Sequence, residues 1–231
     1  MDKELRIGGY RFPMVYVQGT GERYYRFGLE NSQLQVSIKD FYLSTYTVTQ
    51  QVWHQVMGVN PSHAKDDFKP VECVSFDDVA EFLKQLNYSQ FSDEASNKFR
   101  LPTETEWEYA ARGGNYWGEY FVYSGSDNIE DVGWYKRNSG GRTHIVGQKQ
   151  PNQLGIYDMS GNVWEWCQDY FQPAIREIPL DGSPCLKENE YRVVRGGCFH
   201  NYGIHCAAMK RYEIIADSRD NSVGFRIAVS A

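Results

Sequence analysis

The residues best suited to chemistry are two cysteines and two histidines that lie within one nine-residue segment. They are Cys198, His200, His205 and Cys206. Thiolate and imidazole groups are favoured ligands of zinc and copper, so one interpretation of this cluster is a metal site. The alternative is structural, with Cys206 buried and Cys198 packed beside the preceding glycine turn. The chain contains no CxxC pair among its five cysteines, so neither a zinc ribbon nor a disulfide scaffold is expected.

The composition indicates a globular protein with a loop-rich fold. The 231 residues suffice for a substantial core, and an aromatic content of 15% with 21 glycines favours a core of Trp and Tyr. A formal charge of −6 argues against a nucleic-acid partner, and no apolar run is long enough for a membrane span. The start Met1-Asp2-Lys3-Glu4 precedes no apolar signal segment. The expected location is cytoplasmic as written, or cell-surface or secreted if a leader has been removed.

Three helices are predicted from their end signals. The first runs from about Thr49 to Met57 and ends at Gly58, where a left-handed cap belongs. The second begins at Ser75, and the third begins at Thr103 with a capping box and stops at Gly113-Gly114. Helical signals fade after this point.

Strands are predicted on both sides of these helices. The expected ranges are 12–27 with a glycine turn inside it, 36–46, 143–146, 191–195 and 224–229. Early helices followed by a loop-dominated half with short strands predict an α+β fold. No linker divides the chain, so we expect a single domain over residues 1–231.

Four segments form an ordered set of motifs. They are LPTETEWEYAARGG at 101–114, GIYDMSGNVWEW at 155–166, RVVRGG at 192–197 and VGFR at 223–226. Together they resemble the formylglycine-generating-enzyme (sulfatase-modifying-factor) family, over about Met14 to Val229. The resemblance implies a C-type-lectin-like fold, with a small twisted antiparallel sheet, a few helices and long loops. It leaves the function open, because the family includes oxidases, sulfoxide synthases and non-catalytic binding proteins.

The resemblance also implies a copper site whose ligands this chain lacks. Catalytic members hold copper(I) with two cysteines, the first four residues after the Gly-Gly turn and the second five residues later. Asn201 stands four residues after Gly197, and Cys206 lies in a Cys-Ala-Ala segment similar to the family's structural one. Cys198 takes the place of the usual serine. The catalytic pair and its copper are therefore not expected, and neither is enzyme activity.

A structural calcium ion is a second implication of the resemblance. In the family, the loop that matches residues 158–165 wraps a cation. Here Asp158 and Glu165 would supply carboxylates, and Gly161 and Val163 would supply backbone carbonyls, which are hard oxygen ligands suited to calcium. The alternative is that Asp158 caps the turn and Glu165 pairs with Arg195 or Arg226, which read as buried framework residues. By the same reasoning, Trp164 and Trp166 are interpreted as core.

The segment 198–221 occupies the place of the family's active-site floor. Its aromatic, amide and small side chains resemble an antibody-like binding surface. Its bracketing by framework motifs is similar to the variable proteins of diversity-generating retroelements. The alternative is an ordinary family member with drifted loop residues. The predicted ligand-binding residues are Cys198, Phe199, His200, Asn201, Tyr202, Ile204, His205, Tyr212, Arg219 and Asn221.

These observations favour a non-catalytic module that binds a protein or carbohydrate ligand through its C-terminal loops. One rival hypothesis is a copper-dependent oxidase that acts on a peptidyl cysteine or another thiol through Cys198 and Cys206. Another is a structural accessory domain of a multiprotein system. The sequence leaves the ligand and the oligomeric state open.

Overall fold

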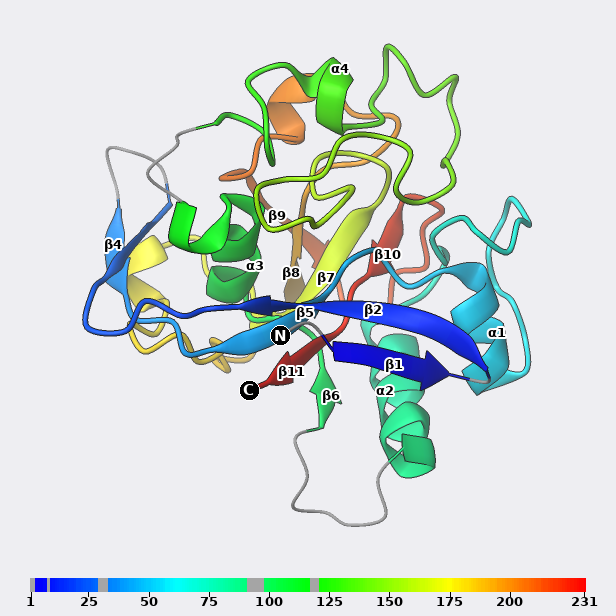
Figure 1. Ribbon diagram of the computed structural model, residues 1–231, viewed down its shortest axis with the longest axis horizontal. Coiled ribbons are helices and arrows are strands. Elements are labelled where there is room, and N and C mark those ends of the chain that lie inside the picture. The colour runs from blue at the N-terminus through cyan, green and yellow to red at the C-terminus, as the bar shows by residue number, and fades with distance from the viewer. Residues whose placement is uncertain (1–2, 8, 29–32, 91–97, 117–120) are drawn as a thin grey trace.

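The computed structural model describes residues 3–7, 9–28, 33–90, 98–116 and 121–231 (Figure 1). Strands from both ends of the chain share one five-stranded antiparallel sheet. Its order is β1 (Lys3–Ile7), β2 (Tyr10–Val17), β5 (Phe41–Ser44), β11 (Ala228–Ser230) and β6 (Phe99–Arg100). The last strand of the chain therefore closes against early strands, with Ala228 opposite Leu43. The first two residues, Met1 and Asp2, lie outside the described residues.

A four-stranded sheet carries the second half of the molecule. Its order is β10 (Val223–Phe225), β7 (Trp164–Tyr170), β8 (Tyr191–Arg195) and β9 (Arg211–Ile215). The pairs β7–β8 and β8–β9 are antiparallel, whereas β10 runs parallel to β7. The strands β3 (Tyr25–Phe27) and β4 (Leu34–Val36) form a separate two-stranded antiparallel sheet.

The three predicted helices are confirmed at their predicted ends. They are α1 (Gln50–Met57), α2 (Phe76–Gln90) and α3 (Glu104–Ala111). Gly58 ends α1 in the left-handed region with φ 72°, and Thr103 opens α3 with a complete capping box. A one-turn helix α4 (Ile129–Val132) and the 3-10 turns η2 (Gly114–Tyr116), η3 (Ile175–Glu177) and η4 (Gly203–His205) lie in the loops.

The four-stranded sheet is covered on both faces. Val193 packs into a cluster with Trp107 of α3, whereas its neighbour Val194 packs into the cluster that contains Trp53 and Phe82. Successive side chains of a strand point to opposite faces, so β8 lies between the two cores. Trp53 of α1 stacks on Phe82 of α2 with ring centroids 5.1 Å apart. Figure 1 shows α3 on one side of this sheet and α1 with α2 on the other.

Several strand predictions need correction. Residues 143–146 form no strand, because the His144 N–H donates to the Asn162 side chain and the Val146 N–H to the Phe68 carbonyl. The range 12–27 is confirmed as strands around a turn, because β2 and β3 flank the glycine turn. The ranges 36–46 and 224–229 were each predicted as one strand, but each contains residues of two strands separated by a break. The strands β7 and β9 were not predicted.

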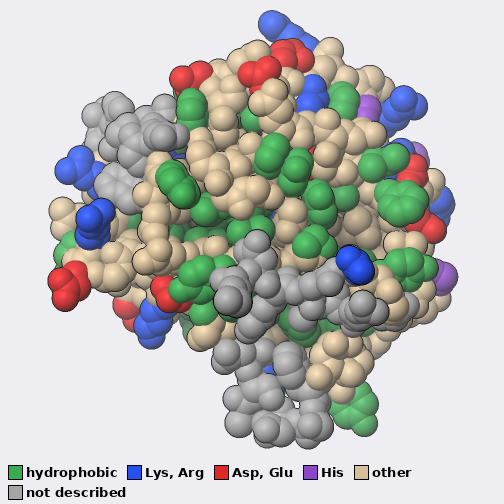
Figure 2. Space-filling view, viewed as in Figure 1, with side chains coloured by type: hydrophobic (Ala, Val, Ile, Leu, Met, Phe, Trp, Pro, Cys, Tyr) green, Lys and Arg blue, Asp and Glu red, His purple; other side chains and the backbone are tan. Residues whose placement is uncertain are grey.

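Charged side chains show no single-sign face in the view of Figure 2, where lysines, arginines and carboxylates lie along the outline with hydrophobic side chains between them. Among the described residues, none of the helices has the length and apolar character that crossing a membrane requires.

Candidate functional site

Two arginines, the buried Arg195 and the half-buried Arg211, tie the four-stranded sheet to α3. Arg195 on β8 donates to Glu108 at 2.5 Å and lies 3.6 Å from Glu104. Arg211 on β9 donates to both oxygens of Glu104, at 2.6 and 2.8 Å. The side chains of Arg195, Glu104 and Glu108 have no exposed surface. An unpaired charge would be strongly destabilising there, so these contacts fix the strands that carry the site.

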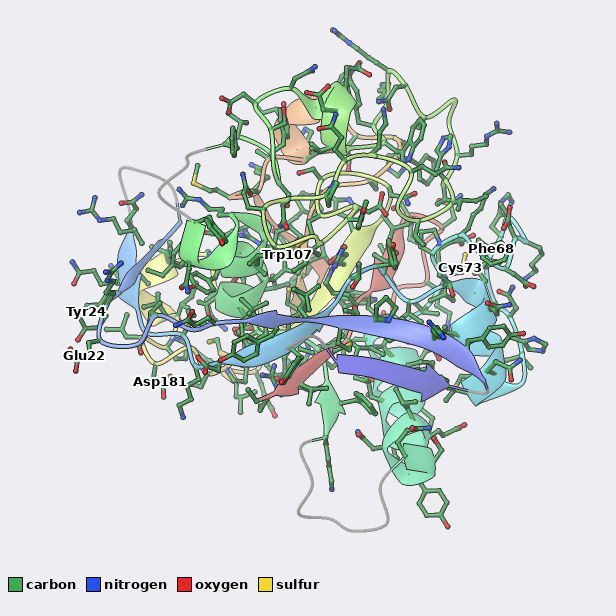
Figure 3. The ribbon with its side chains drawn as sticks, in the orientation of Figure 1. Glu22, Tyr24, Phe68, Cys73, Trp107 and Asp181 are labelled. Carbon is green, nitrogen blue, oxygen red and sulfur yellow. The ribbon has the colours of Figure 1, made fainter. Side chains whose placement is uncertain are left out.

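Arg226 and Glu165 form a further buried ion pair, with two hydrogen bonds of 2.6 and 2.7 Å. The Trp107 Nε1–H of α3 also donates to Glu165, and Figure 3 shows Trp107 near the centre of the molecule. Both oxygens of Glu165 are therefore engaged. The interpretation of Arg195 and Arg226 as framework residues is confirmed, as is that of Trp164 and Trp166 as core, since the two rings are 4% and 0% exposed.

The thiols of Cys198 and Cys206 lie buried beside the Gly196-Gly197 turn. A Cβ on Gly197, whose φ is 73°, would come within 2.6 Å of the Cys206 sulfur. Burial raises the pKa of Cys198 to about 11 and that of Cys206 to about 12. In the described part of the chain, no three His, Cys, Asp or Glu side chains are grouped as metal ligands. Copper(I) binds thiolates, so this environment favours the structural interpretation of both cysteines.

Asn201, at the position of the family's first catalytic cysteine, organises the loop that follows the turn. Its Oδ1 accepts hydrogen bonds from the Cys198 N–H at 3.1 Å and from the Cys198 thiol at 2.9 Å. The Lys136 N–H donates to the Asn201 carbonyl at 2.9 Å, and the Lys136 ammonium lies 4.2 Å from the centre of the Tyr202 ring. The backbone of this loop is thus anchored, while Tyr202 and Ile204 remain 54% and 73% exposed.

An open groove of about 550 Å³ lies between this loop and β9. A ring pair forms part of its wall, because Tyr212 of β9 stacks on Trp164 of β7 with centroids 5.2 Å apart and 19° between the planes. The lining brings together His200, Asn201, His205 and Tyr212 of the predicted set, with Tyr191, Glu213 and Asp220 beside them. The volume falls in the range of small-ligand and side-chain sites, which is about 300–1,000 Å³.

The other predicted binding residues lie elsewhere. Cys198 and Phe199 are buried, whereas Tyr202, Ile204 and Asn221 are exposed without lining the groove. Figure 1 shows η4, which carries Ile204, beside α4. The predicted set therefore divides into groove residues, exposed residues next to them in sequence, and buried supports.

Arg219 joins the loop 216–222 to the start of α2. It donates to both oxygens of Asp78, at 2.6 and 2.8 Å. The Phe76 N–H donates to the Ala216 carbonyl, and the Cys73 N–H donates to the Asp220 carbonyl. Burial raises the pKa of Asp78, but hydrogen bonds from Arg219 and Ser75 outweigh it and hold that pKa below its usual value. Arg219 thus positions one side of the groove.

The predicted calcium ligands fit an ion only in part. Both oxygens of Glu165 accept hydrogen bonds from Arg226 or Trp107, so a cation there would compete with a buried ion pair. Asp158 is buried, its Oδ2 accepts from the Gly147 N–H, and its Oδ1 has no hydrogen-bond partner among the residues that the structure describes. Burial raises the pKa of Asp158 to about 6. Gly161 and Val163 lie on the same buried loop. Calcium at Asp158 stays a prediction.

Tyr191 and Glu213 are groove residues that the sequence did not single out. Both lie on strands, at the start of β8 and in the middle of β9. The alternation of polar and apolar residues from Arg211 to Ile214 is the sequence signal for strand β9 and could have identified Glu213.

Comparison with known proteins shows what the chain is similar to. A family model described as sulfatase-modifying factor enzyme 1-like domain matches residues 11–231. The chain is 34% identical over 211 residues to chaperone protein LppX of Paenibacillus barcinonensis, covering 72% of this chain and 71% of that one. It is 32% identical over 205 residues to the formylglycine-generating enzyme of Streptomyces coelicolor, covering 78% of this chain and 61% of the enzyme.

A solved structure extends the likeness over the whole chain. Treponema denticola variable protein 1 superposes with a TM-score of 0.89 at 28% identity, covering 100% of this chain and 99% of that one. The predicted α+β, C-type-lectin-like fold is thereby confirmed. Both resemblances drawn from the sequence, one to a family that includes enzymes and one to variable proteins, are confirmed as resemblances.

Proposed function

The chain belongs to the sulfatase-modifying factor enzyme 1-like family, and we propose that it serves there as a non-catalytic module that binds a ligand through the groove and the loops around it. The ligand would be a protein or a carbohydrate. Contacts would come from His200, Asn201, His205 and Tyr212 in the groove and from Tyr202 and Ile204 on the adjoining loop.

One observation carries this proposal: exposed side chains are mounted on strands that ion pairs with the buried carboxylates of Glu104 and Glu108 hold in place. Arg195 and Arg211 hold β8 and β9 onto α3, while Tyr202, Ile204 and Tyr212 are 54%, 73% and 45% exposed. Rigid aromatic contacts on anchored backbone lose little conformational entropy on binding, which is the design of antibody-type surfaces. The likeness to Treponema denticola variable protein 1 supports the same function.

The non-catalytic part of the proposal has a direct test. The purified protein is titrated with copper(I) under reducing conditions, and bound metal is counted by mass spectrometry. We expect no stoichiometric copper, because Asn201 replaces one thiolate and both remaining thiols are buried with raised pKa values. One copper per chain, lost in Cys206→Ser but retained in Cys185→Ser, would contradict this part of the proposal and support the oxidase alternative.

A further inference from the structure

The strand β9 forms one edge of the four-stranded sheet and is its least buried strand. All of its residues are half-buried or exposed, whereas β10 is buried throughout and β8 is buried over its second half. In the described part of the chain, β9 pairs with β8 alone. An edge strand presents unpaired backbone N–H and C=O groups to whatever lies beside it.

The register of β8 and β9 fixes which backbone groups of β9 point away from the sheet. The Ala216 N–H donates to the Glu190 carbonyl at 3.2 Å, directly after β9 ends at Ile215. Pairs in an antiparallel ladder alternate between hydrogen-bonded and non-hydrogen-bonded. Counting back from Ala216 in steps of two, Ile214 and Tyr212 form hydrogen-bonded pairs with β8.

The remaining residues of β9, which are Arg211, Glu213 and Ile215, turn their backbone groups outwards. The Ser218 N–H donates to the Ile215 carbonyl at 3.0 Å. The other outward N–H and C=O groups have no hydrogen-bond partner among the residues that the structure describes. Arg211 and Glu213 thus offer both backbone groups to a neighbouring strand.

The groove described above follows this edge. The consecutive residues 212–215 of β9 all line it, although successive side chains of a strand point to opposite faces. A groove that reaches residues of both faces passes along the backbone edge between them. Residues of the loops 200–205 and 218–222 line its other side. The space beside the outward backbone groups is therefore open.

The two faces of the sheet differ in chemistry at this edge. Ile214 packs against the core cluster that contains Trp164, and Tyr212 stacks on the Trp164 ring, so this face is apolar. Arg211 and Glu213 alternate with them on the face towards α3, where Arg211 bonds a carboxylate of that helix. An added strand would therefore place apolar side chains beside Tyr212 and Ile214 and polar side chains beside Glu213.

Charge argues against a second copy of the chain as the added strand. Two antiparallel copies of β9 that bonded through Arg211, Glu213 and Ile215 would pair symmetrically about Glu213. The two Glu213 carboxylates would then lie directly opposite each other, and like charges in that position are destabilising. Charged side chains commonly protect edge strands from such self-pairing.

We infer that β9 receives an extended segment of a partner protein as an added strand. Backbone groups of the segment would bond the outward groups of Arg211 and Glu213, and every second side chain would enter the groove beside Tyr212 and Ile214. Strand addition at a free sheet edge is a recurring mode of peptide recognition. This inference rests on the proposed function and narrows its ligand from a protein or carbohydrate to an extended polypeptide that alternates apolar and polar residues.

The test titrates the isotope-labelled protein with the peptide acetyl-Lys-Thr-Val-Thr-Val-Thr-Lys-amide and follows backbone amide exchange by NMR. In the free protein, the amides of Glu213 and Ile215 should exchange faster than those of Tyr212 and Ile214, which bond to β8. Saturating peptide should slow exchange at Glu213 and Ile215 by about tenfold or more, because their N–H groups become paired.

Two N-methylated forms of the peptide are the matched probes. One carries the methyl groups on its valines and the other on its threonines, so each form blocks the N–H groups along one edge of the peptide strand. One edge alone can face β9. One form should therefore bind about tenfold or more weakly than the parent peptide, and the other should bind within about twofold of it. The equal charge of both forms separates backbone pairing from electrostatic attraction.

Proline tests the same edge from the side of the protein. Proline lacks the N–H and is tolerated in edge strands where that group points to solvent. Glu213→Pro should therefore fold and should bind the parent peptide about tenfold or more weakly than the wild type. Ile214→Pro removes an N–H that bonds β8, so it should lower the melting temperature more than Glu213→Pro does. That comparison checks the register independently of any ligand.

Any of four results would overturn the inference: no binding of the parent peptide, equal affinity of the two methylated forms, unchanged exchange at Glu213 and Ile215 in the bound state, or unchanged peptide binding in Glu213→Pro. A wild-type dimer in sedimentation that Glu213→Pro converts to a monomer would assign the edge to a second copy and would equally overturn it.

The neutral oligosaccharide maltohexaose is titrated in parallel. Amide shifts at His200, Asn201 and Tyr212 with the glycan, and none with the peptide, would reject strand addition and leave the proposed binding function standing.

Discussion

Tyr212 lies flat on Trp164, with 5.2 Å between the ring centroids, although the two residues belong to strands on opposite sides of β8. One ring is nearly buried at 4% exposure and the other is 45% exposed. The stack therefore joins the core to the groove. The buried Trp164 ring supports the Tyr212 ring, which is exposed at the groove.

This division predicts unequal costs of truncation. Trp164→Ala removes a buried ring and should lower the free energy of unfolding by about 3–5 kcal/mol. Tyr212→Ala loses mainly the stacking contact and should cost about 1 kcal/mol. Urea denaturation of the two variants measures both values. Equal losses of unfolding free energy in the two variants would show that Tyr212 is a core residue and not an exposed residue available for binding.

The buried pair of Arg195 and Glu108 predicts a non-additive result. Arg195→Met removes the buried ion-pair partner of Glu108, which keeps its hydrogen bonds from Tyr25 and Gly28, and should destabilise the fold by about 3–5 kcal/mol. Adding Glu108→Gln to the same chain should recover part of that loss. A double variant as unstable as the sum of both single variants would contradict a paired framework.

The contact between Arg219 and Asp78 predicts an effect on loop order rather than on stability. Both side chains are partly exposed, so Arg219→Ala should cost less than about 1 kcal/mol of unfolding free energy. Amide exchange in residues 216–222 should nevertheless accelerate, while exchange in β8 stays unchanged. Acid should act in the same way, because the lowered pKa of Asp78 means that the contact is lost as the pH falls through that pKa. Unchanged exchange in Arg219→Ala would show that the loop holds its place without the contact.

Asp158 predicts a pH dependence of the opposite sign. Its pKa is raised to about 6 by burial, so the folded state holds this proton more tightly than the unfolded state. Its ionisation should destabilise the fold progressively as the pH rises from about 4 to 7, by a few kcal/mol at most. Asp158→Asn removes this term, so the variant should gain stability relative to the wild type over that range. The measurement is urea unfolding at several pH values, and a constant difference between the two proteins would contradict the raised pKa.

The same unfolding experiment, repeated with calcium present, tests the predicted calcium site. A calcium ion at the free oxygen of Asp158 would replace the proton and flatten the wild-type curve as the asparagine does. Magnesium serves as the matched control cation. A wild-type curve that calcium leaves unchanged would overturn the calcium prediction.

The helices were predictable because their signals are local. Thr49, Ser75 and Thr103 each lie within a few residues of the backbone groups that they cap. The strand β7 was not predictable from alternation, since Glu165 and Asp169 are buried along with the aromatic residues between and beside them. Glu165 is tolerated there because Arg226, distant in sequence, pairs with it, and a single sequence does not display that pairing.

The groove was predictable in part. The bracketing motifs located His200, Asn201, His205 and Tyr212, but the predicted set also contained the buried Phe199 and the tethered Arg219. Whether a side chain of the segment 198–221 is exposed depends on its contacts with the neighbouring loop 134–139 and with α2. Those contacts are long-range, so residue type alone did not separate presented side chains from supports.

The most direct test of the proposed binding function is randomisation of six surface positions, five exposed and one, His205, half-buried, on an otherwise unchanged chain. The positions are His200, Tyr202, Ile204, His205, Tyr212 and Asn221. The variants are displayed on cells, sorted for folding by thermal challenge, and then sorted for binding to a protein target. We expect most variants to keep a melting temperature within about 5 °C of the wild type, and we expect some of them to bind the target. Matched randomisation of buried framework positions should unfold nearly all variants. General unfolding of the six-position library would show that these side chains hold the fold together, and would contradict the account.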